Sequence, residues 1–173
     1  DAQESRGLGD VYKRQIRSIR RMKARVDNER LPRGADRNTH TKLGRGALTD
    51  IEWTVQLLTM MHAHSHPALR EPSTLKALDV LEETELLSRE ACTLLRDAWL
   101  MATKARNALV LVRGKRVDQL PQPGHQLAQV AAASGWDPSE NQQFLEAYLK
   151  ATRHARRVVD EVFWGEPESF EHD

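Results

Sequence analysis

The chain has 173 residues and a mass of 19.7 kDa, a size at which one domain can bury an ample core without disulfides or metals. It holds one cysteine, Cys92, which excludes an internal disulfide framework and a cysteine-based zinc site. Aromatic residues make up only 5% of the chain, and this composition favours helices over a β-sandwich. No apolar run approaches the roughly 20 residues of a membrane span, so we expect a cytoplasmic protein that does not enter a membrane.

Charge is distributed unevenly along the chain. Residues 11–45 hold twelve lysines or arginines against three acids, whereas the net charge of the whole chain is only +1. A basic segment of this kind is typical of a surface that meets phosphates or nucleic acid, or of a solvated helix beside an acidic neighbour. The sequence of residues 1–15 does not match the pattern of the rest of the chain, and we expect these residues to be a non-native or disordered leader.

Apolar residues at helical spacing predict a basic helix over residues 16–30. The apolar face of this helix is predicted to contain Ile16, Ile19, Met22 or Lys23, and Val26. A polar linker with glycines follows over residues 31–48, in which residues 39–43 have the pattern of a short strand. The next helix is predicted to begin with a capping box formed by Thr49 and Glu52.

Four further helices are predicted downstream, over residues 74–83, 88–113, 126–133 and 138–164. Ser88 and Gly114 are the expected caps of the longest of them. The expected fold is therefore an all-α helical bundle of about five to six helices, with a basic N-terminal helix and a glycine-bearing linker. We expect the bundle domain to span residues 49–165, preceded by the helix and linker at 16–48 and followed by a loose acidic tail at 166–173.

The segment KLGRGALTDIEW, from Lys42 to Trp53, is the most informative part of the sequence. Gly44 and Gly46 allow a sharp turn around Arg45, directly before a helix N-terminus whose free N–H groups could face a phosphate. The alternative is a tight corner in which the glycines are needed for steric reasons alone, and the spacing by itself favours that alternative.

Carboxylates and histidines could also suggest a metal site. Asp50 and Glu52 lie about 200° apart around a helix, so they do not converge on one ion. The simplest roles are an interaction with the helix dipole for Asp50 and capping for Glu52. Of His62, His64 and His66 only the first and last share a helical face, and a zinc site would need further ligands nearby. No HExxH-type pattern is present, which favours a fraying helix end. We therefore expect neither a metal site nor catalytic residues in this chain.

At KLGRGALTDIEW the chain resembles the family of bifunctional glutamine synthetase adenylyltransferase/adenylyl-removing enzymes. That family has the signature Lys-x-Gly-x-Gly-Gly-(Leu/Ile)-x-Asp-(Ile/Val)-Glu-(Trp/Phe), followed by Gln in the same helix. The residues that fit are Lys42, Gly44, Gly46, Leu48, Asp50, Ile51, Glu52, Trp53 and Gln56. Ala47 departs, because it stands where a second glycine is usual. Similar segments at 20–23, 29–32, 111–114, 118–121 and 162–165 extend the resemblance over about residues 16–165.

The resemblance implies that this chain is the C-terminal helical domain of such an enzyme, with residues 16–48 belonging to a missing nucleotidyltransferase domain. The full enzyme would use ATP and Mg²⁺ to adenylylate and de-adenylylate glutamine synthetase, and so control nitrogen assimilation. Its implied partners are glutamine synthetase, a PII signalling protein and the missing domain.

The family's catalytic signature, Gly-Ser followed by Asp-x-Asp, does not occur in this sequence. We therefore expect the fragment to be inactive alone and to bind neither ATP nor Mg²⁺. The candidates for the nucleotide site or the domain junction are Lys42, Gly44, Arg45, Gly46, Asp50 and Glu52. The alternatives are a free-standing helical protein-interaction module and, less favoured, a nucleic-acid-binding helical protein that uses the basic helix.

Overall fold

Helices form nearly all of the regular structure in the computed structural model, which describes residues 2–165. Within that range the α-helices are α1 (Ala2–Arg30), α2 (Leu48–His62), α3 (Thr74–Glu83), α4 (Arg89–Arg113), α5 (His125–Ala133) and α6 (Asn141–Val159). Two 3-10 turns, η1 (Pro67–Leu69) and η2 (Pro138–Glu140), lie between them, and a π-helical turn, η3 (Asp160–Trp164), extends α6. The expected all-α bundle is confirmed, and the expected tail at 166–173 lies outside the described residues.

Local capping signals explain where several helices begin and end. The Ser88 hydroxyl accepts a hydrogen bond from the Ala91 N–H at 3.1 Å, which caps the start of α4. Gly114, with a φ of +66°, ends the same helix in the left-handed conformation. Ser73 caps α3 in the same way as Ser88 caps α4.

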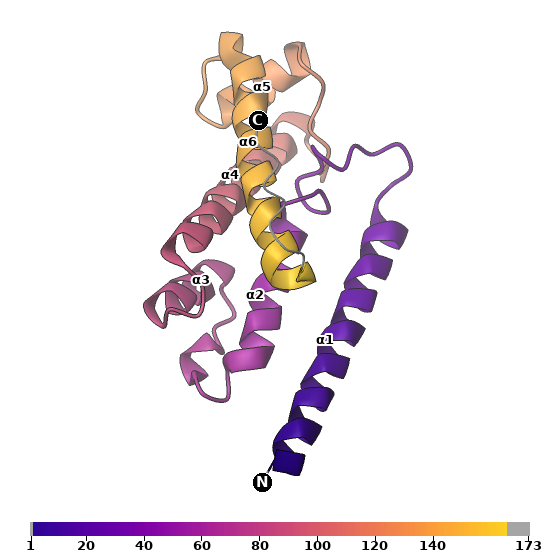
Figure 1. Cartoon of the computed structure of the whole chain (residues 1–173). Coiled ribbons are helices and arrows are strands. Elements are labelled where there is room, and N and C mark those ends of the chain that lie inside the picture. The colour runs from indigo at the N-terminus through magenta and orange to yellow at the C-terminus, as the bar shows by residue number, and fades with distance from the viewer. Residues whose placement is uncertain (1, 166–173) are drawn as a thin grey trace, which may run out of the picture.

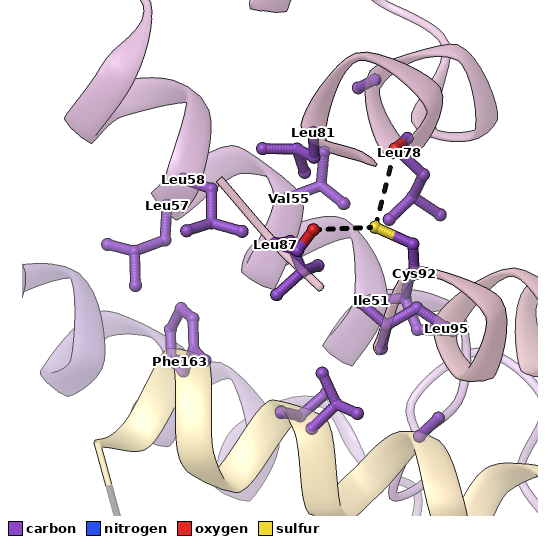
Figure 2. Packing of buried hydrophobic residues seen from close by; sticks show 14 of the residues in the cluster. Ile51, Val55, Leu57, Leu58, Leu78, Leu81, Leu87, Cys92, Leu95 and Phe163 are labelled. Carbon is purple, nitrogen blue, oxygen red and sulfur yellow. Dashed lines mark hydrogen bonds between the residues drawn. The ribbon is translucent and has the colours of Figure 1, made fainter. Parts of the chain in front are cut away.

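The core consists of two clusters of buried side chains that share α4 and α6. The first cluster lies between α2, α3, α4 and the end of α6, and it includes Ile51, Leu81, Leu95 and Phe163 (Figure 2). The second cluster joins α4, α5 and α6 around Leu109, Leu127, Val130, Phe144 and Tyr148. The alanines on the buried face of α4 are small, so α6 can pack closely along it (Figure 1).

Helix α1 lies along one side of the molecule, and the linker arches from its end back to α2 (Figure 1). Ile16 and Ile19 are partly buried against the first core cluster. Of the two alternatives for the next inward position, Met22 is 57% exposed and Lys23 only 1% exposed, so Lys23 faces the bundle. Residues 2–15 continue the same helix, and their non-native origin stays a prediction.

The expected strand at residues 39–43 is wrong. Residue His40 forms only an isolated antiparallel bridge with Gln119, in the loop before α5. The Thr41 N–H donates to the Asp118 carbonyl at 2.7 Å, and the Leu120 N–H donates to the Thr39 carbonyl at 3.0 Å. The pairing ends there because the chain then turns sharply at Gly44 and enters α2.

Candidate functional site

The two glycines of the corner before α2 are explained by close backbone contacts. A Cβ at Gly46 would lie 1.9 Å from the carbonyl oxygen of Thr152 on α6, and Gly46 has a φ of +68°. A Cβ at Gly44 would lie 2.3 Å from the carbonyl oxygen of His40. Both positions therefore have a steric need for glycine, in line with the alternative that the spacing favoured.

The carboxylate of Asp50 connects the corner before α2 to two other helices through hydrogen bonds. Asp50 is only 2% exposed, and its Oδ2 accepts a hydrogen bond from the Gly46 N–H at 2.8 Å. The predicted capping box of Thr49 and Glu52 is wrong, because α2 begins at Leu48 and its N-cap residue is Ala47, which has no side-chain cap. Asp50, three residues after the N-cap, instead reaches back to satisfy a free N–H group.

Two cations hold the buried carboxylate from opposite sides. The Lys23 Nζ atom of α1 lies 2.7 Å from Asp50 Oδ1, and the Arg156 Nη1 atom of α6 lies 2.9 Å from Asp50 Oδ2. Lys23 also pairs with Asp27, and Arg156 Nε pairs with Asp160 at 2.7 Å. One carboxylate thus joins three helices that are far apart in sequence.

The same ion pairs determine the direction in which the pKa of Arg156 shifts. Burial alone would lower the pKa of its guanidinium. The negative charges of Asp50 and Asp160, and the hydrogen bonds to them, outweigh this effect and raise the pKa overall. Arg156 is therefore a permanent cation inside the fold.

Sequence reasoning missed the roles of Lys23 and Arg156. The signal for Lys23 was present, because its position continues the apolar spacing of Ile16 and Ile19. A lysine in such a stripe indicates a buried carboxylate on a neighbouring helix, since a buried ammonium needs a partner. Arg156 offers no comparable signal, because arginines are frequent on the last helix.

The remaining candidates, Lys42 and Glu52, lie outside this network. Glu52 is half-buried, and its burial raises its pKa, while the charges of Lys42 and Arg106 act in the opposite direction. Glu52 lines a groove along α2 with Gln56 and Arg70, whereas Asp50 lines a different cavity. The structure therefore does not bring Asp50 and Glu52 together. Lys42 is exposed beside the corner.

The cavity next to Asp50 has a volume of about 100 Å³ and is partly open to solvent. It lies between the end of α1, the linker, the start of α2 and α6. Its lining residues are Asp27, Leu31, Arg37, Leu43, Arg45, Asp50 and Arg156. Arg45, the arginine between the two glycines, is thus placed at a small polar cavity. The first N–H groups of α2, those of Leu48 and Thr49, donate to the carbonyls of Thr41 and Lys42.

Among residues 2–165, no group of three or more His, Cys, Asp or Glu side chains is arranged to hold a metal ion. None of the helices in this part of the chain is long and apolar enough to cross a membrane.

A protein-family model described as GlnD PII-uridylyltransferase matches residues 20–163, which include Lys23, Asp50 and Arg156. The chain belongs to the GlnD PII-uridylyltransferase family. The match covers the corner, the bundle and the part of α1 that carries Lys23, so the ion network lies wholly within the family's shared region.

The chain is also similar in sequence to proteins named bifunctional glutamine synthetase adenylyltransferase/adenylyl-removing enzyme. The chain is 70% identical over 163 residues to such a protein from Corynebacterium diphtheriae, covering 94% of this chain and 15% of that protein. It is 72% identical over 151 residues to one from Corynebacterium glutamicum, covering 87% and 14%. A relative from Mycobacterium avium is 63% identical over 148 residues, covering 86% and 15%.

These relatives confirm the resemblance predicted from KLGRGALTDIEW. The chain spans about 15% of the length of the curated relatives that it matches. As a member of the GlnD PII-uridylyltransferase family, it thus corresponds to a small helical part of much longer proteins.

Proposed function

We propose that this chain is the C-terminal helical domain of a glutamine synthetase adenylyltransferase/adenylyl-removing enzyme, and that it supports the nucleotidyltransferase domain of that enzyme. The 70% identity to a relative of that name supports the assignment. The absence of Gly-Ser and Asp-x-Asp from the sequence supports a non-catalytic role for this part. Residues 16–48 would form the link to the catalytic domain, and residues 49–165 the bundle.

The observation that carries the supporting role is the fixation of the corner by Asp50. Because the buried carboxylate is bonded to α1, to α6 and to the Gly46 N–H, the linker cannot shift without breaking charged hydrogen bonds. The exposed Lys42 and the half-buried Glu52 are therefore presented from a rigid base. Such a surface suits a fixed junction between two domains, with Lys42 as its exposed cation.

The whole enzyme would bind ATP and Mg²⁺ in the nucleotidyltransferase domain and transfer AMP to glutamine synthetase in the cytoplasm. A PII signalling protein would regulate the balance between addition and removal of AMP. This chain would contribute to those activities by positioning the catalytic domain, and by itself it would transfer no AMP.

The test uses the whole enzyme that contains this chain. We expect Lys42→Ala to lower kcat/KM for AMP incorporation into glutamine synthetase at least tenfold, as expected when a charged contact at a junction is lost. The control is Lys150→Ala, which removes an equally exposed lysine from α6 and should leave the rate unchanged. Equal melting temperatures for both variants would show that folding is intact.

Two results would contradict the proposal. One is full activity of the Lys42→Ala enzyme, which would remove Lys42 from the junction. The other is AMP transfer to glutamine synthetase by the purified chain in the presence of ATP and Mg²⁺, which would require a catalytic site within these 173 residues.

A further inference from the structure

Two arginines lie at the mouth of the cavity beside Asp50. Arg37 and Arg45 both line the cavity and both are exposed. Their backbones are held together by a hydrogen bond from the Arg45 N–H to the Arg37 carbonyl at 2.8 Å. Within residues 2–165, neither guanidinium makes a side-chain hydrogen bond or an ion pair.

The carboxylates of the same cavity already have cationic partners within the fold. Asp50 receives Lys23 on Oδ1 and both Arg156 and the Gly46 N–H on Oδ2. Asp27 receives Lys23 as well. Arg37 and Arg45 are therefore not paired with Asp27 or Asp50, and their positive charges are available to a ligand from solvent.

We propose that this cavity binds an oxyanion of the phosphate class, held by the guanidinium groups of Arg37 and Arg45 at the mouth. This site uses side chains other than Lys42, and it can exist whether or not the chain acts as a domain support. The N-terminus of α2 takes no part, because the N–H groups of Leu48 and Thr49 already donate to the carbonyls of Thr41 and Lys42.

The size of the cavity and the type of cation both suit this ligand class. About 100 Å³ is several times the ~30 Å³ that one water occupies in the liquid, but far below the roughly 300 Å³ at which pockets for whole drug-sized molecules begin. A single phosphate group therefore fits, while the rest of a phosphate ester would remain outside. Arginine forks match the tetrahedral oxygens of phosphate in pairs of parallel hydrogen bonds.

The test measures binding of inorganic phosphate to the full 173-residue chain by isothermal titration calorimetry in a low-salt buffer free of phosphate. We expect saturable binding with one site, and at least tenfold weaker binding in the double variant Arg37→Gln/Arg45→Gln. The matched control is Arg33→Gln/Arg153→Gln, which removes two exposed arginines and the same net charge elsewhere. Phosphate affinity in this control should change less than twofold, on the order expected from long-range charge alone.

A second titration with AMP distinguishes the two sources of a phosphate group. AMP binding at least tenfold tighter than phosphate, with the same loss in Arg37→Gln/Arg45→Gln, would assign the site to a nucleotide phosphate. Equal or weaker AMP binding would assign it to free phosphate.

The proposal is overturned if phosphate shows no saturable binding, or if both double variants weaken it equally. Arg37 and Arg45 are exposed, and within residues 2–165 their side chains make no hydrogen bond or ion pair, so their loss should not unfold the chain. Circular dichroism and the urea midpoint of each variant verify this. Arg45→Lys, which retains the charge but loses the fork, should bind phosphate with an affinity between those of the parent chain and the double variant.

Discussion

Lys23 and Asp50 form a buried ion pair across 27 residues of sequence, with 2.7 Å between Lys23 Nζ and Asp50 Oδ1. The side chains are 1% and 2% exposed, so water does not screen their interaction. The pair is the polar connection that fixes the position of α1 against the start of α2. The apolar contacts of Ile16 and Ile19 stabilise the same helix further toward its N-terminus.

Removing the lysine should therefore destabilise the fold strongly. We expect Lys23→Met to lower the free energy of unfolding by about 3–5 kcal/mol, because the Asp50 charge stays buried with one partner fewer. Urea unfolding followed by circular dichroism measures the loss. Arg21→Met changes an exposed residue of the same helix and should cost no more than about 0.5 kcal/mol. Equal stability of Lys23→Met and the parent chain would show that this ion pair does not stabilise the fold.

Gly46 and Gly114 provide a matched pair of glycines, because their φ angles are +68° and +66°. A Cβ at Gly46 would overlap the Thr152 carbonyl, whereas a Cβ at Gly114 meets nothing within 4 Å. We expect Gly114→Ala to cost about 1 kcal/mol for the left-handed backbone alone. Gly46→Ala should cost at least about 3 kcal/mol, because α6 or the corner must also move.

The same urea unfolding experiment compares the two variants under identical conditions. Similar losses for Gly46→Ala and Gly114→Ala would mean that the close contact with α6 is not present in solution. A distinctly larger loss for Gly46→Ala than for Gly114→Ala would confirm that the corner is packed against Thr152.

Much of the fold could be predicted because its signals are local. Ser88 and Gly114 fix the ends of α4 through hydrogen bonds within a few residues of each other. The prediction fails where the deciding partner is distant. Two local starts are acceptable for α2. In one, Thr49 is the N-cap and Glu52 completes a capping box, and in the other, Ala47 is the N-cap and Asp50 lies three residues after it.

The second start is adopted because Lys23 and Arg156, from the two ends of the chain, draw the Asp50 carboxylate inward. The strand expected at 39–43 fails for the same kind of reason, since the strand-like pairing of His40 is a single isolated bridge to Gln119 in a distant loop. The sequence could therefore indicate residues of this corner but not the contacts that they make. Asp50, Gly44 and Gly46 could be named from the motif, whereas their ion pairs and close contacts depend on α1 and α6.

His40 should make the stability depend on pH. Its Nδ1 atom accepts the Leu43 N–H at 2.9 Å, which requires the neutral ring, and burial lowers its pKa. Asp118 opposes this shift, while Lys42 and Arg106 add to it. The unfolded chain therefore gains the proton first as the pH falls below about 6.5, and the free energy of unfolding decreases from there downward.

We expect His40→Asn, which retains an acceptor for Leu43 but cannot titrate, to remove part of this dependence. Between pH 7 and pH 5 the free energy of unfolding of the parent chain, measured by urea, should fall more steeply than that of the variant, by at most about 1.4 kcal/mol per pH unit. His62 and His154, whose pKa values burial also lowers, contribute equally in both proteins. Parallel curves would show that His40 does not resist protonation in the folded state.

The rate at which the Cys92 thiol is alkylated measures how well the first core cluster excludes reagents from solvent. Its thiol lies near the carbonyl oxygens of Leu78 and Leu87 among buried leucines (Figure 2), and burial raises its pKa to about 11. At pH 8 only about a thousandth of such a thiol is ionised, against roughly a tenth or more for an exposed one. We therefore expect alkylation by iodoacetamide to be at least about a hundredfold slower in the native chain than in urea.

Because the chain has a single cysteine, the labelling rate has only one source. In the native chain, reaction requires opening of the cluster, so its rate should rise in Lys23→Met in proportion to the fraction of open molecules. Arg21→Met should label as slowly as the parent chain. If the native chain and the chain in urea reacted at similar rates, Cys92 would be accessible, and the packing of α3 and α4 around it would be incorrect.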